Sequence, residues 1–286
     1  MSVRNNEDRI AAMHSDSAPI QNLTPPTPQQ EPSALSFVTP TEFVELPSKG
    51  RYYLEGHPLH NEETIEIRYM TAKEEDILTS RTLLKKGIAI DRLLQSVIVN
   101  KKIKADDLLI GDKNAVIIAT RRTGYGAEYE TKVICPACTE YVTHSFDLNE
   151  GHVNYGGDVE GVTETEEGTF IIPLEKLKVN VEVKLLTGKD EKALAMIANK
   201  KKKHKMEEAN LTDQFKQFIV SVNEHKDASL ISSLIQNMPA IDSRALRNTY
   251  RDLVPNIDLA QDFECSDCGL EQTLEVPFNA DFFWVK

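Results

Sequence analysis

Apolar and polar residues alternate along residues 63–70, ETIEIRYM, where Ile65 and Ile67 are flanked by polar neighbours. A period of two is typical of a half-buried β-strand. The same alternation recurs in residues 169–174, TFIIPL, and in residues 179–186, VNVEVKLL. We therefore expect a β segment to open the fold and further strands to lie in the middle of the chain.

Helical spacing dominates two long stretches, one from Thr71 to about residue 126 and one from Thr187 to about Tyr250. Each begins with a hydroxyl residue followed three positions later by an acid, Glu74 in the first stretch and Asp190 in the second. This spacing is that of a capping box, in which the hydroxyl and the carboxylate each accept a hydrogen bond at the helix start. The pattern predicts helices that begin at these two positions and bury their apolar sides.

Two more acids precede apolar runs of helical spacing, and we expect Asp91 and Asp112 to be N-caps. The most basic segment, residues 199–205 (NKKKKHK), is interpreted as the solvated end of a helix, where cations are favourable. The Gly-rich and acidic residues 150–168 indicate an exposed loop.

Together these patterns predict an α+β protein with a helical body. Residues 1–40 hold six of the thirteen prolines and few apolar side chains, which is typical of a disordered tail, either a solvated leader or a tether that orders on a partner. The expected divisions are a tail (1–40), an N-terminal β segment (41–70), a helical unit (71–126), a β module (127–148 with 256–286) and an inserted β/helical domain (149–255).

Charge narrows the classes of partner. The 286-residue chain has a formal net charge of −12, whereas binding to nucleic acids and anionic membranes depends mainly on Lys and Arg. No apolar run reaches the roughly 20 residues of a membrane helix, and the N-terminus lacks the apolar stretch of a signal peptide. We expect a cytoplasmic protein that binds neither nucleic acid nor membrane.

All four cysteines of the chain lie in two Cys-x-x-Cys pairs, Cys135 with Cys138 and Cys265 with Cys268. Each pair stands between strand-like runs, so each is expected at the tip of a β-hairpin. Zinc prefers four soft ligands in a tetrahedron, and two such turns facing one another would supply them without leaving an open position for water. The pattern predicts one structural zinc ion in a zinc-ribbon-like β module built from hairpins that are distant in sequence.

Residues 139–264 separate the two pairs, which is far more than in a compact zinc ribbon, so these residues must form an insertion whose ends return to one place. Two disulfides are the main alternative but do not suit a cytoplasmic chain. A thioredoxin-like redox pair would require a helix start in a βαβ setting, which neither pair has.

Other candidate chemistry is weak. His57 and His60 lie on a Pro-containing loop and are interpreted as surface residues, and His144 as an exposed strand residue. The chain contains no phosphate-binding Gly-rich loop and no nucleophile elbow. These observations favour a protein that is not an enzyme and has no small-molecule substrate.

Several motifs occur in a familiar order: FVELPSKGRYY, IEIRYMTAKEEDIL, LLIGDKNAVIIATRRTGYG running into CPAC, IDLAQDFECSDCG, and a terminal FNADFFW. In this combination the chain resembles the baseplate hub and hub-assembly protein family of T-even-type contractile-tailed phages, over about residues 41–138 and 250–286. The resemblance implies a structural or assembly subunit without catalytic activity, assembled in the host bacterial cytoplasm into the virion tail baseplate. Its implied partners are other baseplate and tail proteins. The alternative is a zinc-ribbon adaptor or nucleic-acid-binding factor, which would need basic and aromatic residues beside the cysteines.

The C-terminus concentrates aromatic side chains, including Phe282, Phe283 and the only tryptophan, Trp284. One interpretation is that these rings complete the chain's own core. The other is that they anchor another baseplate subunit, because aromatic rings dominate interface hot spots.

Overall fold

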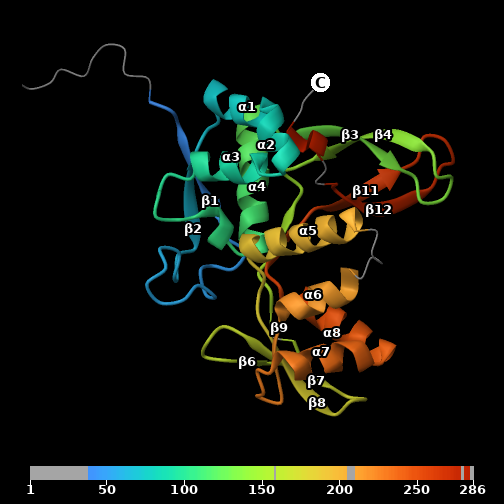
Figure 1. Cartoon of the computed structure of the whole chain (residues 1–286). Helices are drawn as coiled ribbons and strands as arrows, with labels where there is room; N and C mark the ends of the chain where they lie inside the picture. Colours follow the sequence, from blue (N-terminus) through green and yellow to red (C-terminus); the bar gives the residue numbers. More distant parts are fainter. Residues whose placement is uncertain (1–37, 158, 205–209, 278–279, 284–286) are drawn as a thin grey trace, which may run out of the picture. The chain divides into compact units, whose positions relative to one another are not determined.

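The computed structural model of the chain describes residues 38–157, 159–204, 210–277 and 280–283, to which every structural statement below refers (Figure 1). The predicted disordered tail, apart from residues 38–40, lies outside these ranges. The described part mixes helices with small antiparallel sheets, as the sequence predicted for the fold class. None of its helices has the length and apolar character needed to cross a membrane.

The N-terminal half begins with an antiparallel hairpin of β1 (Thr41–Glu45) and β2 (Thr64–Arg68). Ile65 and Ile67 are buried, which confirms the predicted strand. The hairpin is followed by four α-helices and a short 3-10 helix: α1 (Ala72–Thr79), α2 (Arg81–Lys86), α3 (Ala89–Val97), η3 (Ala105–Asp107) and α4 (Ile110–Tyr125). In Figure 1, α4 is the long green helix behind the shorter helices α1 to α3.

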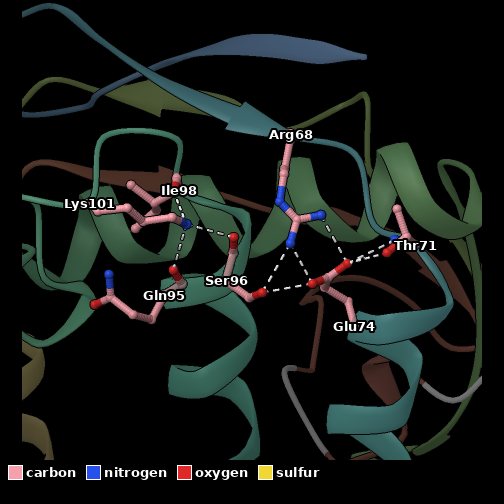
Figure 2. A network of polar contacts seen from close by, with 7 residues as sticks. All are labelled: Arg68, Thr71, Glu74, Gln95, Ser96, Ile98 and Lys101. Atoms are coloured by element: carbon pink, nitrogen blue, oxygen red, sulfur yellow. Dashed lines mark hydrogen bonds and ion pairs between the residues drawn. The ribbon is translucent and has the colours of Figure 1, made fainter. Parts of the chain in front are cut away.

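Both predicted capping boxes are present, at the starts of α1 and of α5 (Gly188–Lys203). The box of α1 extends into a larger network, in which the Glu74 carboxylate accepts hydrogen bonds from Arg68, Thr71 and Ser96 (Figure 2). Burial alone would raise the pKa of Glu74, but these donors outweigh it and hold the pKa at about 2. The network therefore joins three elements: the end of β2, the start of α1 and the last turn of α3.

The two other predicted N-caps are wrong. Helix α3 has Ile88 at its N-cap position and α4 has Leu109, so Asp91 and Asp112 lie inside the first turns. Asp112 is fully buried and accepts hydrogen bonds from the Ser48 backbone and hydroxyl and from the Tyr53 hydroxyl. Its carboxylate therefore holds the loop after β1 on the start of α4, a contact between residues far apart in sequence.

The C-terminal half contains a four-stranded antiparallel sheet in the order β6-β7-β8-β9, accompanied by three helices besides α5. The bounds are β6 (Thr163–Glu164), β7 (Phe170–Leu174), β8 (Val179–Val183), β9 (Ile219–Val222), α6 (Asn210–Phe218), α7 (Ala228–Asn237) and α8 (Ala240–Leu253). Residues 150–168 were predicted to be an exposed loop, but they also hold β6 and β5 (His152–Asn154). The predicted burial of the apolar side of α5 is wrong for Ile197, which is 37% exposed.

Apolar side chains form two buried clusters. The larger one joins residues of β1, β2 and α4 to residues of β7, β8, α6 and α8, so the N-terminal and C-terminal halves share it. The second lies under the two Cys-x-x-Cys pairs and includes Tyr129, Phe146 and Phe263. Two further hairpins supply much of this second cluster: β3 (Glu128–Ile134) with β4 (Tyr141–Asp147), the first hairpin, and β11 (Ala260–Glu264) with β12 (Glu271–Glu275), the second hairpin.

The chain between these hairpins leaves and returns at one place. Strand β5, just after the first hairpin, pairs antiparallel with β10 (Asn256–Asp258), just before the second, and His152 lies opposite Asp258. The returning segment also lies against α4, where a Cβ atom on Gly111 would be 1.9 Å from the Pro255 carbonyl oxygen. Close packing at this glycine and the β5–β10 pair therefore bring the second hairpin to the first.

Candidate metal centre

The four cysteines come together at the ends of the two hairpins. The Sγ atoms of Cys135 and Cys268 are 3.6 Å apart and those of Cys138 and Cys265 are 3.8 Å apart. All four Sγ atoms lie within 4.8 Å of one another, and no disulfide joins them. In Figure 1 the hairpins run side by side at the right of the picture.

These separations can be compared with those that a metal ion would require. A tetrahedral ion with metal–sulfur bonds of about 2.3 Å separates its sulfur ligands by about 3.8 Å. The two short Sγ–Sγ distances, 3.6 and 3.8 Å, agree with this value. The cluster can therefore hold a single metal ion with little rearrangement.

The first Cys turn, residues 135–140, is closed by two backbone hydrogen bonds. The Cys135 N–H donates to the Glu140 carbonyl and the Thr139 N–H donates to the Cys135 carbonyl, both at 2.9 Å. Thr139 has a left-handed backbone with φ of 61°. This tight turn points both thiols of the pair to the same side.

The second Cys turn, residues 265–270, repeats this geometry. The Cys265 N–H donates to the Leu270 carbonyl and the Gly269 N–H donates to the Cys265 carbonyl, again at 2.9 Å. Gly269 has φ of 68°, and it occupies the position of Thr139 in the first turn. The two turns are thus equivalent, as two halves of one tetrahedral site would be.

Contacts away from the sulfurs also join the hairpins. The Gln261 amide of β11 accepts a hydrogen bond from the Asp147 backbone N–H at 3.0 Å and donates to the Asp147 carbonyl at 2.6 Å. The His144 ring lies against the rings of Phe146 and Phe263. His144 was predicted to be exposed but is half-buried, because its side chain points between the hairpins.

Burial and charge are unequal among the thiols. Cys135 and Cys265 are buried, whereas Cys138 is half-buried and Cys268 is exposed. The backbone N–H of Cys138 is the largest cause that lowers the pKa of Cys135, to about 6. The Glu140 N–H acts in the same direction on Cys138, but burial and the neighbouring sulfurs outweigh it and raise the pKa of Cys138 to about 12.

The opposed shifts of Cys135 and Cys138 are those of neighbouring thiols that compete for one negative charge. Like charges that share a site disfavour one another. A bound cation would remove this repulsion, because a coordinating thiol is deprotonated by the metal. The donor set therefore suits a cation with a preference for sulfur.

The C-terminal aromatic residues are placed differently from the cysteines. Phe282 and Phe283 are each only 2% exposed and pack in the cluster of apolar residues beneath the hairpins. Trp284 lies outside the described residues. At the two phenylalanines the rings are thus part of the chain's own core, and the role of a partner anchor stays a prediction.

Sequence reasoning missed the residue that holds this C-terminal segment. Arg121 of α4 is buried and donates hydrogen bonds to the carbonyls of Phe282, Gly126 and Glu128, at 2.8, 2.7 and 3.1 Å. Its guanidinium also lies over the Tyr125 ring. The only signal in the sequence was a basic pair at the end of a predicted helix, which is equally typical of a solvated surface.

The fold and the site define the class of protein: a mixed helix and sheet protein in which four thiols at two distant hairpins can bind a metal ion. A comparison with known protein families matches residues 39–284 to the family described as T4 bacteriophage base plate protein. The chain belongs to this family and is a T4-type phage baseplate protein. No curated protein and no solved structure matches it.

The family match confirms the resemblance recognised in the sequence at the level of the baseplate. It implies a place in the virion tail baseplate and other phage tail proteins as partners. It also favours a structural role over a catalytic one. Its range ends at residue 284 and begins at residue 39, so it covers both hairpins and the segment between them.

Proposed function

We propose that this chain is a structural or assembly subunit of the baseplate hub, without catalytic activity, that acts through contacts with other baseplate and tail proteins. Membership of the base plate family is the observation that carries the proposal. The more specific place in the hub rests on the resemblance of the sequence motifs to hub proteins. Assembly would take place in the host bacterial cytoplasm.

Within this role, one zinc ion bound by the four cysteines would be structural. Four thiolates, each from a closed turn, leave no ligand position for water, which is the arrangement of structural zinc sites. The ion would fix the second hairpin on the first across the long insertion. Zinc is preferred over other sulfur-seeking ions because it is tetrahedral and has no redox chemistry.

The alternative, a nucleic-acid-binding zinc factor, has less support. The exposed residues beside the Cys turns include Glu140, Glu264, Asp267 and Glu271, and Lys132 is their only basic neighbour on the strands. Carboxylates at these positions repel a phosphate backbone. We therefore propose protein partners and no nucleic acid or small-molecule substrate.

Complementation of a phage that lacks this gene tests the function. Supplied in trans, the wild-type protein should restore complete baseplates in electron micrographs of infected-cell lysates, and mass spectrometry of purified hub complexes should contain the chain. Normal baseplates without any supplied protein would contradict an assembly role. Complexes that contain the chain only outside the hub would refute the hub position and keep the baseplate role.

Metal analysis tests the zinc assignment separately. Protein purified without added zinc should contain about one equivalent by elemental analysis, because a closed four-thiolate site binds zinc very tightly. Wild-type protein without metal and with two intact disulfides would end this assignment.

A further inference from the structure

A groove runs between helix α8 and strand β7. Its volume is about 290 Å³, just below the roughly 300–1,000 Å³ of small-molecule pockets, so it suits side chains better than a whole ligand. Ile241 and Ala245 of α8 line one side, Val162 and Pro173 line the other, and buried Ile172 lies among them. Ile241 is 59% exposed. We call this feature the α8 groove.

The α8 groove is held in shape by a buried carboxylate. Asp242 of α8 lines the groove and accepts hydrogen bonds from the backbone N–H groups of Lys176 and Leu177, at 3.2 and 2.9 Å. Both residues follow β7, so this carboxylate fixes α8 to the turn after the strand. Pro173 has no N–H that could donate to an added strand. The groove is therefore preformed, and it accepts side chains rather than a further strand.

Three arginines follow one another along the solvent side of α8. Arg244, Arg247 and Arg251 are exposed, and their spacings of three and four residues place them on one face of the helix. Arg244 is also three residues from Ile241, so this face borders the α8 groove. Among the described residues, no ion pair involves Arg244 or Arg247, and Arg251 pairs only with its exposed neighbour Asp252. We call the three residues the arginine row.

The side of the groove away from the arginine row carries a different charge. Glu160 and Glu175 line it, and Lys176 is the only basic residue among the described ones that line the groove. A nucleic acid is charged along its whole length, so its phosphates would be repelled by these carboxylates. A protein segment can carry acids on one side only. Charge complementarity therefore favours a protein segment whose acids face the arginine row.

The shape of the surface indicates that this segment is a helix. The groove extends along α8 from Ile241 to Thr249, about 12 Å at the rise of an α-helix, and the arginine row extends over about 10 Å. A concave surface of about two helical turns is complementary to a convex one, such as the face of a helix, and not to a second copy of itself. An amphipathic helix presents apolar residues at i and i+4 with charged residues beside them.

We propose that the α8 groove and the arginine row together bind an acidic amphipathic helix of another baseplate or tail protein. Apolar side chains of that helix enter the groove, and its carboxylates pair with the guanidinium groups of the row, which can bind them in bidentate geometry. The proposal rests on the proposed function in taking the partner from the baseplate or tail. Its test uses the isolated chain, so a failed test would leave the role in the hub intact.

Fluorescence anisotropy with the full chain and synthetic peptides tests the proposal. The probe is a labelled peptide of about 20 residues, long enough to form a helix in water, with leucines on one face, glutamates on the neighbouring face and alanines elsewhere. It should bind, whereas matched peptides with lysine in place of glutamate or serine in place of leucine should bind at least about 10-fold more weakly. Because the net charge of the chain is −12, non-specific attraction would favour the lysine peptide instead.

Charge reversal tests the arginine row. Arg244→Glu/Arg247→Glu should weaken binding of the acidic peptide at least about 10-fold, because it places like charges together. Arg81→Glu/Arg92→Glu, at exposed arginines of α2 and α3, changes the net charge equally and should bind as the wild type does.

A polar substitution tests the groove. Ile241→Ser should weaken binding of the acidic peptide at least about 5-fold, because it removes apolar contact area. Met196→Ser, at a residue of α5 that is 70% exposed, is the matched control and should have no effect. The Tm should be unchanged in these variants, because all the substituted side chains are exposed. If the Tm of Ile241→Ser falls, Ile241→Thr replaces it.

Several outcomes would overturn the proposal. The acidic peptide could fail to bind the wild type up to about 1 mM, or bind the Arg244→Glu/Arg247→Glu variant as tightly as its control. An effect in only one of the two kinds of variant would refute the combined surface. A labelled single-stranded oligonucleotide that binds the row more tightly than the peptide does would assign it to phosphates. Self-association of the wild type that Ile241→Ser abolishes in sedimentation velocity would assign the groove to a second copy.

Discussion

The two Cys turns have the same backbone hydrogen bonds and a left-handed residue at the same position. This residue is Thr139 in the first turn and Gly269 in the second. Glycine adopts a positive φ at no steric cost, whereas a β-branched residue adopts it with strain. In the first turn, the Thr139 hydroxyl donates a local hydrogen bond to the Cys138 carbonyl. Because two residues with opposite preferences adopt the same backbone, the shape of both turns follows from the convergence of the four thiols and not from the preference of each turn residue.

The hairpins also differ in how they are supported. The first has seven residues in each strand and follows directly after α4, whereas the second has five in each strand and arrives only after the long insertion. The second hairpin should thus depend more on the cysteine cluster for its position. Four substitutions test this difference.

Loss of one ligand should have the largest effect. Cys265→Ser should abolish stoichiometric metal binding and lower the free energy of unfolding by about 4 kcal/mol, because a structural metal contributes directly to folding. Elemental analysis and thermal unfolding monitored by circular dichroism measure both effects. Ser266→Ala, at an exposed residue of the same turn, serves as the control. An unchanged Tm in Cys265→Ser would mean that the hairpins hold together without the cluster.

Loss of the contact outside the cluster should rank second. Gln261→Ala removes both hydrogen bonds to the Asp147 backbone and leaves that N–H and carbonyl without these partners, at a cost of about 2–3 kcal/mol. Chemical denaturation with metal bound gives this value. Gln272→Ala, at a half-buried residue of β12 whose side chain has no described hydrogen bond, should cost less than half as much. Equal losses in the two variants would contradict the joining role of Gln261.

Exchange of the turn residues should give smaller effects of opposite sign. Gly269→Thr should destabilise the protein by about 1–2 kcal/mol, because a Cβ atom is unfavourable at this positive φ. Denaturant midpoints in the metal-bound state measure it, and metal stoichiometry should remain unchanged. A neutral result would show that the second turn accepts Thr as readily as the first.

The reverse exchange should have the smallest effect. Thr139→Gly removes the strain of a β-branched residue at φ of 61° but loses the local hydrogen bond and increases the freedom of the unfolded chain. The net expectation is a gain of about 0.5 kcal/mol, measured in the same titration. A loss above about 1 kcal/mol would mean that the Thr139 hydroxyl stabilises the turn more than the backbone strain destabilises it.

Local patterns predicted the features that are encoded locally. Alternation gave the strands around Ile65 and those of both hairpins, and hydroxyl–acid spacing gave the starts of α1 and α5. The Cys-x-x-Cys spacing likewise predicted that the four thiols meet, since each pair already forms half of a site.

The errors concern contacts between distant segments. Asp112 has the sequence signature of an N-cap, but its partners Ser48 and Tyr53 lie some sixty residues away in the sequence. Their hydrogen bonds to its carboxylate hold the side chain in the interior. The role of Arg121 likewise depends on its hydrogen bond to the Phe282 carbonyl, and the residues of β5 form a strand because they pair with β10. Such distant partners leave no periodic pattern in the local sequence.

The length of the segment between the two Cys turns also has a consequence for synthesis of the chain. The first Cys turn leaves the ribosome well before the second, and at about 5–20 residues per second residues 139–264 take roughly 6–25 s to make. During that interval Cys135 and Cys138 can offer a metal only two of the four ligands. A fully ligated ion would therefore mark a polypeptide that has been translated at least as far as Cys268, and a product terminated before that residue could not acquire one.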